Sequence, residues 1–230
     1  MDPIEIICLA NSRKISGRCI AGKIISSNKW MRPVSSRENE EISEEERRYE
    51  NGQMPKLLDI IKIPVKEQKT NLHQYENYLI NDQYYWEKTG EYTQELDALL
   101  DSPNDLWGIG CSSYQGTNDR MPENICNKYS ESLYFIKPQT LKIIVRVEGK
   151  EFDNPKRKVR AEFTYNSTKY LFPVTDPVIE SKYLSGDDGS FALSVENVYL
   201  CVSVGLPYDG YCYKFLASLI IGKQKANRNE

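Results

Sequence analysis

The sequence is poor in histidine and has no long apolar run. Its single histidine, His73, excludes a metal site built from several histidines of one chain, and any Ser-His or Cys-His catalysis would have to use it. We expect His73 to be a surface or partly packed residue. No stretch approaches the roughly 18 to 20 apolar residues that cross a bilayer, which argues against an integral membrane protein. The segment MDPIEIICLA has an acidic start and only a short apolar run, which argues against a signal peptide.

Closely spaced cysteines are also missing. No two of the six cysteines lie two to four residues apart, which excludes a zinc knuckle or a thioredoxin-like pair. Most stand in apolar stretches such as IICLA and YCYKFL, as expected of buried thiols that pack as small hydrophobic groups. We therefore expect six reduced thiols, no metal and no cofactor, in a cytoplasmic protein. The cysteines are Cys8, Cys19, Cys111, Cys126, Cys201 and Cys212.

Motifs for catalysis are absent as well. The segment 107–113 (WGIGCSS) lacks the third glycine of a dinucleotide fingerprint and the Gly-Lys-Ser/Thr of a P-loop, and there is no G-x-S-x-G elbow. Asp187 and Asp188 lie in SGDDGS, a pattern typical of a turn rather than a metal site. No combination of acid, base and nucleophile specifies a reaction. We assign no catalytic residue and favour a binding protein over an enzyme.

What the sequence does contain is a series of short strand patterns. Short helices are predicted at 44–49, where Ser43 and Glu46 have the spacing of a capping box, and at 177–184, where Asp176 precedes Pro177. Residues 83–88 and 94–101 also have helical character, 73–80 fit a strand or a short helix, and 107–118 form a glycine-rich loop. Strands are predicted at 4–9, 17–26, 29–35, 57–65, 133–136, 141–148, 158–165, 168–174, 197–204 and 212–221.

Short strands with one short helix in each half are typical of two small β-barrels rather than an α/β sheet. The hydrophobic fraction of 40% and the charged fraction of 27% are ordinary for a globular chain. The sequence therefore predicts a mainly β protein with two domains. Residues 1–130 are expected to form a barrel with a helical insertion, and residues 131–230 a second barrel.

Several segments together resemble a prokaryotic family of dual OB domains, in which one chain carries two oligonucleotide/oligosaccharide-binding folds. The resemblance covers nearly the whole chain and implies two OB-like barrels with short helices. It also implies nucleic-acid or nucleotide binding, in bacterial defence contexts, and it supplies no catalytic residues. The segments are IICLANSRKISGRCIAGK (6–23), WMRPVS (30–35), ISEEERRYENG (42–52), RAEFTYNSTKYLFPVTDP (160–177) and VYLCVSVGLPYDGYCYKFLASLI (198–220).

The stretch from Ile7 to Arg37 contains no acidic residue, on a chain whose net charge is −3. Such segregation creates a local positive potential that net charge conceals. We predict that this stretch contacts phosphate or nucleic acid, with Trp30 stacking on a base. The alternative is a solvated basic face with Trp30 in the barrel core. The hypothesis requires Arg18 and Arg32 to point to the same side. The predicted binding residues are Arg13, Lys14, Arg18, Lys29, Trp30, Arg32 and Arg37.

A second basic run, in NPKRKVR, follows a predicted loop and is a candidate for tracking a nucleic-acid backbone; a solvated turn explains it equally well. It comprises Lys156, Arg157, Lys158 and Arg160. The stretch 87–105 is acidic and favours a solvated helix or a basic partner. Two functions follow. The first is a non-catalytic module that binds single-stranded nucleic acid or a nucleotide, with no membrane association. The alternative is a scaffold subunit with a protein partner and no nucleic-acid binding.

Overall fold

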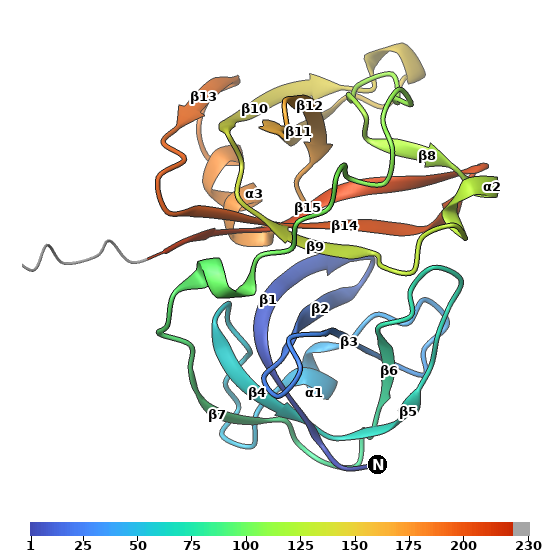
Figure 1. The fold of residues 1–230 in the computed structure, drawn as a ribbon. Helices are drawn as coiled ribbons and strands as arrows, with labels where there is room; N and C mark the ends of the chain where they lie inside the picture. The colour runs from blue at the N-terminus through green and yellow to red at the C-terminus, as the bar shows by residue number, and fades with distance from the viewer. Residues whose placement is uncertain (223–230) are drawn as a thin grey trace, which may run out of the picture.

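The computed structural model describes residues 1–222 and consists of short strands with a few helical turns. Figure 1 shows two stacked β-barrels, one from each half of the chain. No helix within residues 1–222 has the length and apolar character to cross a membrane. The elements of the first half are β1 (Ile4–Lys14), β2 (Gly17–Ile24), β3 (Trp30–Val34), α1 (Glu44–Arg47), β4 (Asp59–Ile63), β5 (Val65–Gln68), β6 (Asn77–Ile80), β7 (Glu87–Glu91) and a 3-10 helix at Leu96–Leu99.

The second half begins with a short strand and a single helical turn, and a sheet of longer strands follows. Its elements are β8 (Arg120–Pro122), α2 (Glu123–Cys126), β9 (Leu133–Ile136), β10 (Thr140–Glu148), a 3-10 helix at Lys150–Phe152, β11 (Lys156–Tyr165), β12 (Thr168–Pro173), α3 (Pro177–Leu184), β13 (Gly189–Leu193), β14 (Val198–Tyr208) and β15 (Tyr211–Ile221).

Local sequence explains helices α1 and α3. The Ser43 side chain accepts a hydrogen bond from the Glu46 amide while the Glu46 carboxylate accepts one from the Ser43 amide, so the predicted capping box is present. Helix α1 ends at Arg47, two residues earlier than predicted. In α3 the Asp176 carboxylate accepts from the amides of Val178 and Ile179, as the sequence predicts.

The first barrel closes through one bent strand. The sheet order is β5-β6-β3-β2-β1-β4-β7, with β3 and β6 parallel and the other pairs antiparallel. Only Pro64 separates β4 from β5, and because proline cannot donate to a sheet ladder, the strand bends there. One half of this strand therefore pairs with β1 and the other half with β6. This is the five-stranded OB arrangement, with β7 added at an edge.

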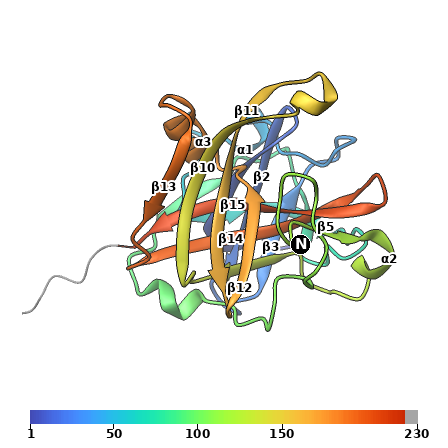
Figure 2. The same cartoon turned by 90° about the horizontal axis from the view of Figure 1, so that it is seen from above.

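The second barrel repeats the first. Strands β10, β11 and β12 form its first three strands, α3 follows, and β13 and β14 share the role of the bent fourth strand. Strand β15 is the fifth, and the bridge from Val174 to Leu216 is parallel, like the β3–β6 pair. In Figure 2 the sheet β12-β11-β10-β13 crosses over β14 and β15. Both halves are thus OB-like barrels, and the predicted fold class is confirmed.

Buried apolar side chains form three clusters. One fills the first barrel, including Ile6, Cys8 and Ile20, and one fills the second barrel. The third lies between the barrels, where Ile7 and Leu9 of β1 meet residues of β9, β14 and β15. Because neighbouring residues of a strand point to opposite faces, β1 is buried on both faces and its sequence is a continuous apolar run rather than an alternating one.

Several predicted elements differ from the structure. Residues 83–88 were predicted to be helical, but they form a turn that leads into β7, so this prediction is wrong. The helix predicted at 94–101 is a single 3-10 turn at Leu96–Leu99. The ambiguous stretch 73–80 contains β6, and 107–118 is a loop, as predicted. The turn at Asn166-Ser167 joins β11 to β12 with positive φ at both residues, which is typical of a two-residue hairpin.

The segment 106–126 packs with the second barrel. Leu106 and Trp107 are fully buried in its core, and β8 pairs with β15. The division at residue 130 stays a prediction, and this packing favours a boundary nearer residue 101.

The cysteine prediction is wrong for one pair. Cys126, at the end of α2, and Cys212, at the start of β15, form a disulfide across 86 residues of sequence. Spacing rules look for neighbouring cysteines, so they miss a pair that the β8–β15 pairing brings together. The other four cysteines are free, and burial raises the pKa of Cys8 to about 12.

A single carboxylate joins the two barrels beside the third cluster. Asp101 accepts from Lys23 Nζ at 2.6 Å, from Trp30 Nε1 at 3.0 Å and from the Phe135 amide at 2.8 Å. Lys23 is only 2% exposed, so its charge depends on Asp101 for compensation. Replacing Asp101 would leave a buried cation and two donors without their acceptor.

We expect Asp101→Ala to lower the free energy of unfolding by about 3 to 5 kcal/mol, the typical cost of removing one partner of a buried ion pair. Chemical denaturation measures this change. Asp82→Ala is the control, since Asp82 forms an exposed ion pair with Lys66 and its loss should cost less than about 1 kcal/mol. Equal destabilisation of the two variants would contradict the role assigned to Asp101.

A second buried lysine lies in the second barrel. Lys214 is fully buried, and its Nζ donates to the Gly108 carbonyl at 2.8 Å. Burial lowers the pKa of Lys214 from its ordinary value of 10.5 to about 8, against the opposing effect of nearby Asp105. The unfolded chain therefore binds more protons than the folded chain between these two values, and stability due to Lys214 rises with pH across that window.

We expect the free energy of unfolding to rise with pH between 7.5 and 9.5 by about 2 kcal/mol more in the unmodified protein than in Lys214→Met. Denaturation at both pH values measures the difference. Comparison of the two proteins cancels the contributions of buried tyrosines and thiols. Parallel pH profiles would show that Lys214 keeps an ordinary pKa.

Candidate nucleotide-binding pocket

A pocket of about 280 Å³ lies where the two barrels meet. OB folds bind ligands on the face of strands 2 and 3 and on the loops that join strands 1–2 and 4–5. In the first barrel these are β2, β3, the turn at 15–16 and the loop at 69–76. The pocket is lined from this face by Lys14, Cys19, Arg32 and Gln74, so it occupies the usual OB site. The second barrel covers the rest of the face.

The pocket lining is positive. Arg13, Lys14 and Arg32 contribute to it, and none of the described lining residues carries a carboxylate. Lys14 has no ion-pair partner within residues 1–222. Arg13 is half exposed and contacts Glu180 of α3 at 2.7 Å. This arrangement leaves cations at the mouth that can take an anionic group from solvent.

One wall of the pocket is apolar. Val204, Leu206 and Phe215, from β14 and β15, form this wall. Ser12, Thr175 and Ser203 add hydroxyl groups. The hydroxyls of Ser12 and Thr175 donate to backbone carbonyls, which leaves their oxygen lone pairs as acceptors. The lining thus combines an apolar surface for a ring with polar groups that can fix its orientation.

Positive charge continues from the pocket along β2. Arg13 and Arg18 lie directly opposite each other in the β1–β2 pair, an unfavourable arrangement of like charges in which Glu180 supplies a counter-ion to Arg13. Burial lowers the pKa of Arg47, and the nearby charge of Arg18 adds to this effect. Arg18 has no ion-pair partner among the described residues, so this rim of the first barrel favours a bound anion.

Two predicted residues are unsuited to the role assigned to them. Arg32 is 4% exposed, and its guanidinium pairs with Glu76 at 2.9 Å and donates to Ser132 at 2.7 Å. Trp30 pairs with Lys23, so alternation puts Arg32 on the same face as Lys23 and Arg18 on the other face. The common side that the hypothesis requires is therefore absent. Trp30 is half-buried, and its indole donates to Asp101, so its ring belongs to the contact between the barrels.

The two other predicted cations outside the second basic run, Lys29 and Arg37, differ in their contacts. Lys29 is exposed in the turn before β3, and Arg37 is 46% exposed and 3.8 Å from Glu41. Neither lines the pocket.

Two of the four residues of the second basic run, Arg157 and Arg160, form ion pairs and hydrogen bonds within the protein. Arg160 is buried between Glu148, at 2.7 Å, and Asp119. Arg157 donates to Asp188 and to the carbonyls of Leu184 and Gly186. Only Lys156 and Lys158 are exposed and without an ion pair within residues 1–222. The loop 112–119 covers this side of the second barrel, because Gln115 accepts from Arg146 and Asp119 accepts from Arg160.

Sequence reasoning missed half of the pocket. Gln74, Thr175, Ser203 and Phe215 come from elements far from residues 7–37, and nothing in their local patterns marks them. Gln74 donates to the Val204 carbonyl across the barrel contact, which positions the loop 69–76 over the second barrel. A resemblance to OB folds points to that loop in general, without identifying the residue.

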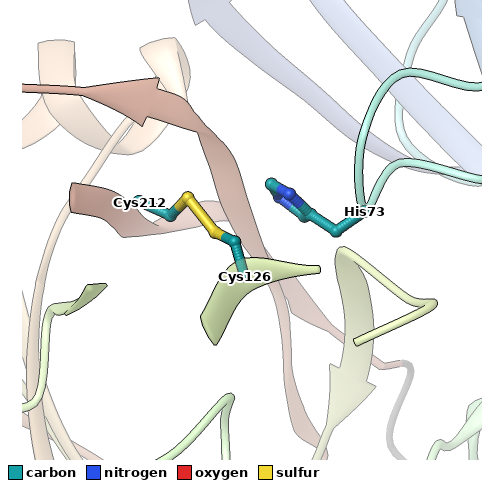
Figure 3. A group of neighbouring side chains, drawn as sticks. All are labelled: His73, Cys126 and Cys212. Carbon is teal, nitrogen blue, oxygen red and sulfur yellow. A yellow bond between two sulfur atoms is a disulfide. The ribbon is translucent and has the colours of Figure 1, made fainter. Parts of the chain in front are cut away.

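His73 is buried rather than at the surface, on the same loop. Its exposed fraction is 0%, and neither ring nitrogen has a hydrogen bond of good geometry, although the backbone of Val204 and Gly205 lies close by. Burial lowers the pKa of His73 and keeps the imidazole neutral. Figure 3 shows the ring directed at the Cys126–Cys212 disulfide.

Comparison with known proteins agrees with this architecture. No curated protein and no solved structure matches the chain. One family profile, described as the dual OB-containing domain, matches residues 4–219. That match spans both barrels and the pocket between them, and it identifies the chain as a member of the dual OB-containing domain family.

Proposed function

We propose that this protein is a binding module that takes a nucleotide, either free or at the end of a single strand, in the pocket between the barrels. The observation that carries the proposal is the lining at the usual OB ligand face, which has Arg13 and Lys14 beside the ion-paired Arg32, an apolar wall with Phe215, and no carboxylate among the described residues. Cations and hydroxyls bind phosphate, and the apolar wall accepts a base.

The shape of the site favours one nucleotide over a long strand. The second barrel covers the first barrel's β1–β2 face, and the loop 112–119 covers part of the second barrel. What remains is a pocket of about 280 Å³, near the lower end of the range for small-molecule sites. Arg13 and Lys14, which line the pocket at the end of β1, then hold the phosphate.

The proposal includes no catalytic step. The described lining residues include no histidine and no carboxylate, so the pocket offers no acid–base pair next to the ligand. The family resemblance extends the proposal to an accessory role beside a catalytic partner in prokaryotic defence. Scaffold function without nucleic-acid binding is the outcome if the binding tests below fail.

We expect Arg13→Ala/Lys14→Ala to raise the Kd for nucleotide by about tenfold or more, because each lost bond to a charged phosphate costs about 1.5 to 3 kcal/mol. Fluorescence anisotropy with short DNA and RNA strands, and calorimetry with a panel of nucleoside monophosphates, measure the change. Lys62→Ala/Lys66→Ala is the charge-matched control, since neither lysine lines the pocket. Affinity should fall with rising salt, with a smaller slope in the Arg13/Lys14 variant.

A second variant separates pocket binding from non-specific attraction. We expect Ser203→Phe to fill the pocket and abolish mononucleotide binding while leaving weak, salt-sensitive strand binding. If the unmodified protein binds neither strands nor mononucleotides at low salt, the proposed function is wrong. If Ser203→Phe binds mononucleotides as well as the unmodified protein, the site lies elsewhere.

A further inference from the structure

His73, Cys126 and Cys212 form a buried cluster that the proposed function does not use. One ring nitrogen of His73 and the two sulfur atoms all lie within 4.8 Å of one another. Figure 3 shows the histidine on one side of the disulfide, with its ring pointing at the two sulfurs. The histidine comes from the β5–β6 loop of the first barrel, and the cysteines come from α2 and β15 of the second.

The histidine has little polar compensation for its burial. Its exposed fraction is 0%, and within residues 1–222 neither ring nitrogen has a hydrogen bond of good geometry, although the backbone of Val204 and Gly205 lies close by. Buried polar groups normally have a partner, and one without a partner calls for an explanation such as an unfilled ion site. A ring nitrogen of His73 within 4.8 Å of two sulfur atoms is the arrangement of a candidate metal ligand set.

The three groups have the chemistry of a zinc site. Cysteine thiolates and neutral imidazole are the ligands that Zn²⁺ prefers, and sites with three protein ligands leave a fourth position for water or another donor. Around a tetrahedral zinc the ligand atoms are about 3.5 to 3.8 Å apart. The three ligand atoms already lie within 4.8 Å of one another, so opening the disulfide and small side-chain movements would give this spacing.

We propose that Cys126, Cys212 and His73 form a redox-controlled zinc site that links the two barrels. A dithiol reductant transfers two electrons to the disulfide, which gives two thiols and the oxidised cyclic form of the reductant. Zn²⁺ then binds the two sulfurs as thiolates, with release of two protons, and takes the imidazole as its third ligand. Disulfide and zinc exclude each other. This proposal differs from the sequence-based expectation that the chain binds no metal.

The test is a zinc titration of reduced and oxidised protein. The chain is reduced with a dithiol, freed of reductant under nitrogen and titrated with Zn²⁺ against a chromophoric chelator. The expected result is one tightly bound Zn²⁺ per chain in the reduced form and none in the oxidised form. Cobalt substituted for zinc should show thiolate-to-metal charge transfer and the strong visible bands of tetrahedral coordination. A reduced protein that keeps its far-ultraviolet circular dichroism and binds neither ion overturns the proposal.

Variants assign the ligands. His73→Asn and Cys126→Ser should each weaken zinc binding by about tenfold or more, since loss of even an outer partner costs that much. Cys19→Ser and Cys111→Ser are controls, because these free, partly exposed cysteines lie outside the cluster, and they should bind zinc like the unmodified protein. Unchanged affinity in a folded His73→Asn overturns the assignment. If that variant does not fold, the cobalt spectrum of the unmodified protein decides. None of these readouts depends on nucleotide binding.

Discussion

Burial of the outer face of β1 and β2 against β14 and β15 is the contact on which the rest of the structure depends. Ile7 and Leu9 point away from the first barrel's core and into the cluster shared with Cys201 and Ala217. Apolar side chains are buried on both faces of β1, so the hydrophobic effect holds the two barrels together rather than leaving them as separate domains joined by a linker. At the edge of this contact, the Asp101 carboxylate accepts hydrogen bonds from donors of both halves of the chain.

The same contact determines what kind of ligand site the molecule has. An OB barrel by itself presents an open face to a strand of nucleic acid. Here the second barrel closes most of that face and supplies a wall containing Val204 and Phe215, so the groove becomes a pocket with a basic mouth. The loop 69–76 is held over the second barrel by Gln74, which makes the pocket lining depend on both halves of the chain.

Much of the fold could be predicted from the sequence because it is encoded locally. Apolar runs marked most strands, and Ser43 and Glu46 marked α1. The stretch 83–88 was misassigned although its aromatic residues favour strands over helices, and pairing with the distant β4 sets the structure that follows.

The site was less predictable because partners decide which charges are free. Arg32 and Arg160 look like their basic neighbours in the sequence, but Glu76 and Glu148 neutralise them in the fold. Positive charge at Arg13 and Lys14 was visible in the sequence. The pairing of Cys126 with Cys212, and the approach of His73 to both, depends on contacts across the whole chain.

The position of β15 has a consequence for biosynthesis. Ser218 of β15 donates to the Leu9 carbonyl across 209 residues of sequence, and Ala217 and Ile220 cover the apolar face of β1. A ribosome must therefore complete almost the whole described chain before that face has its cover. The nascent first barrel carries an exposed apolar surface throughout this interval, when such intermediates are prone to aggregate. Formation of β15 is thus the step that removes this surface from solvent.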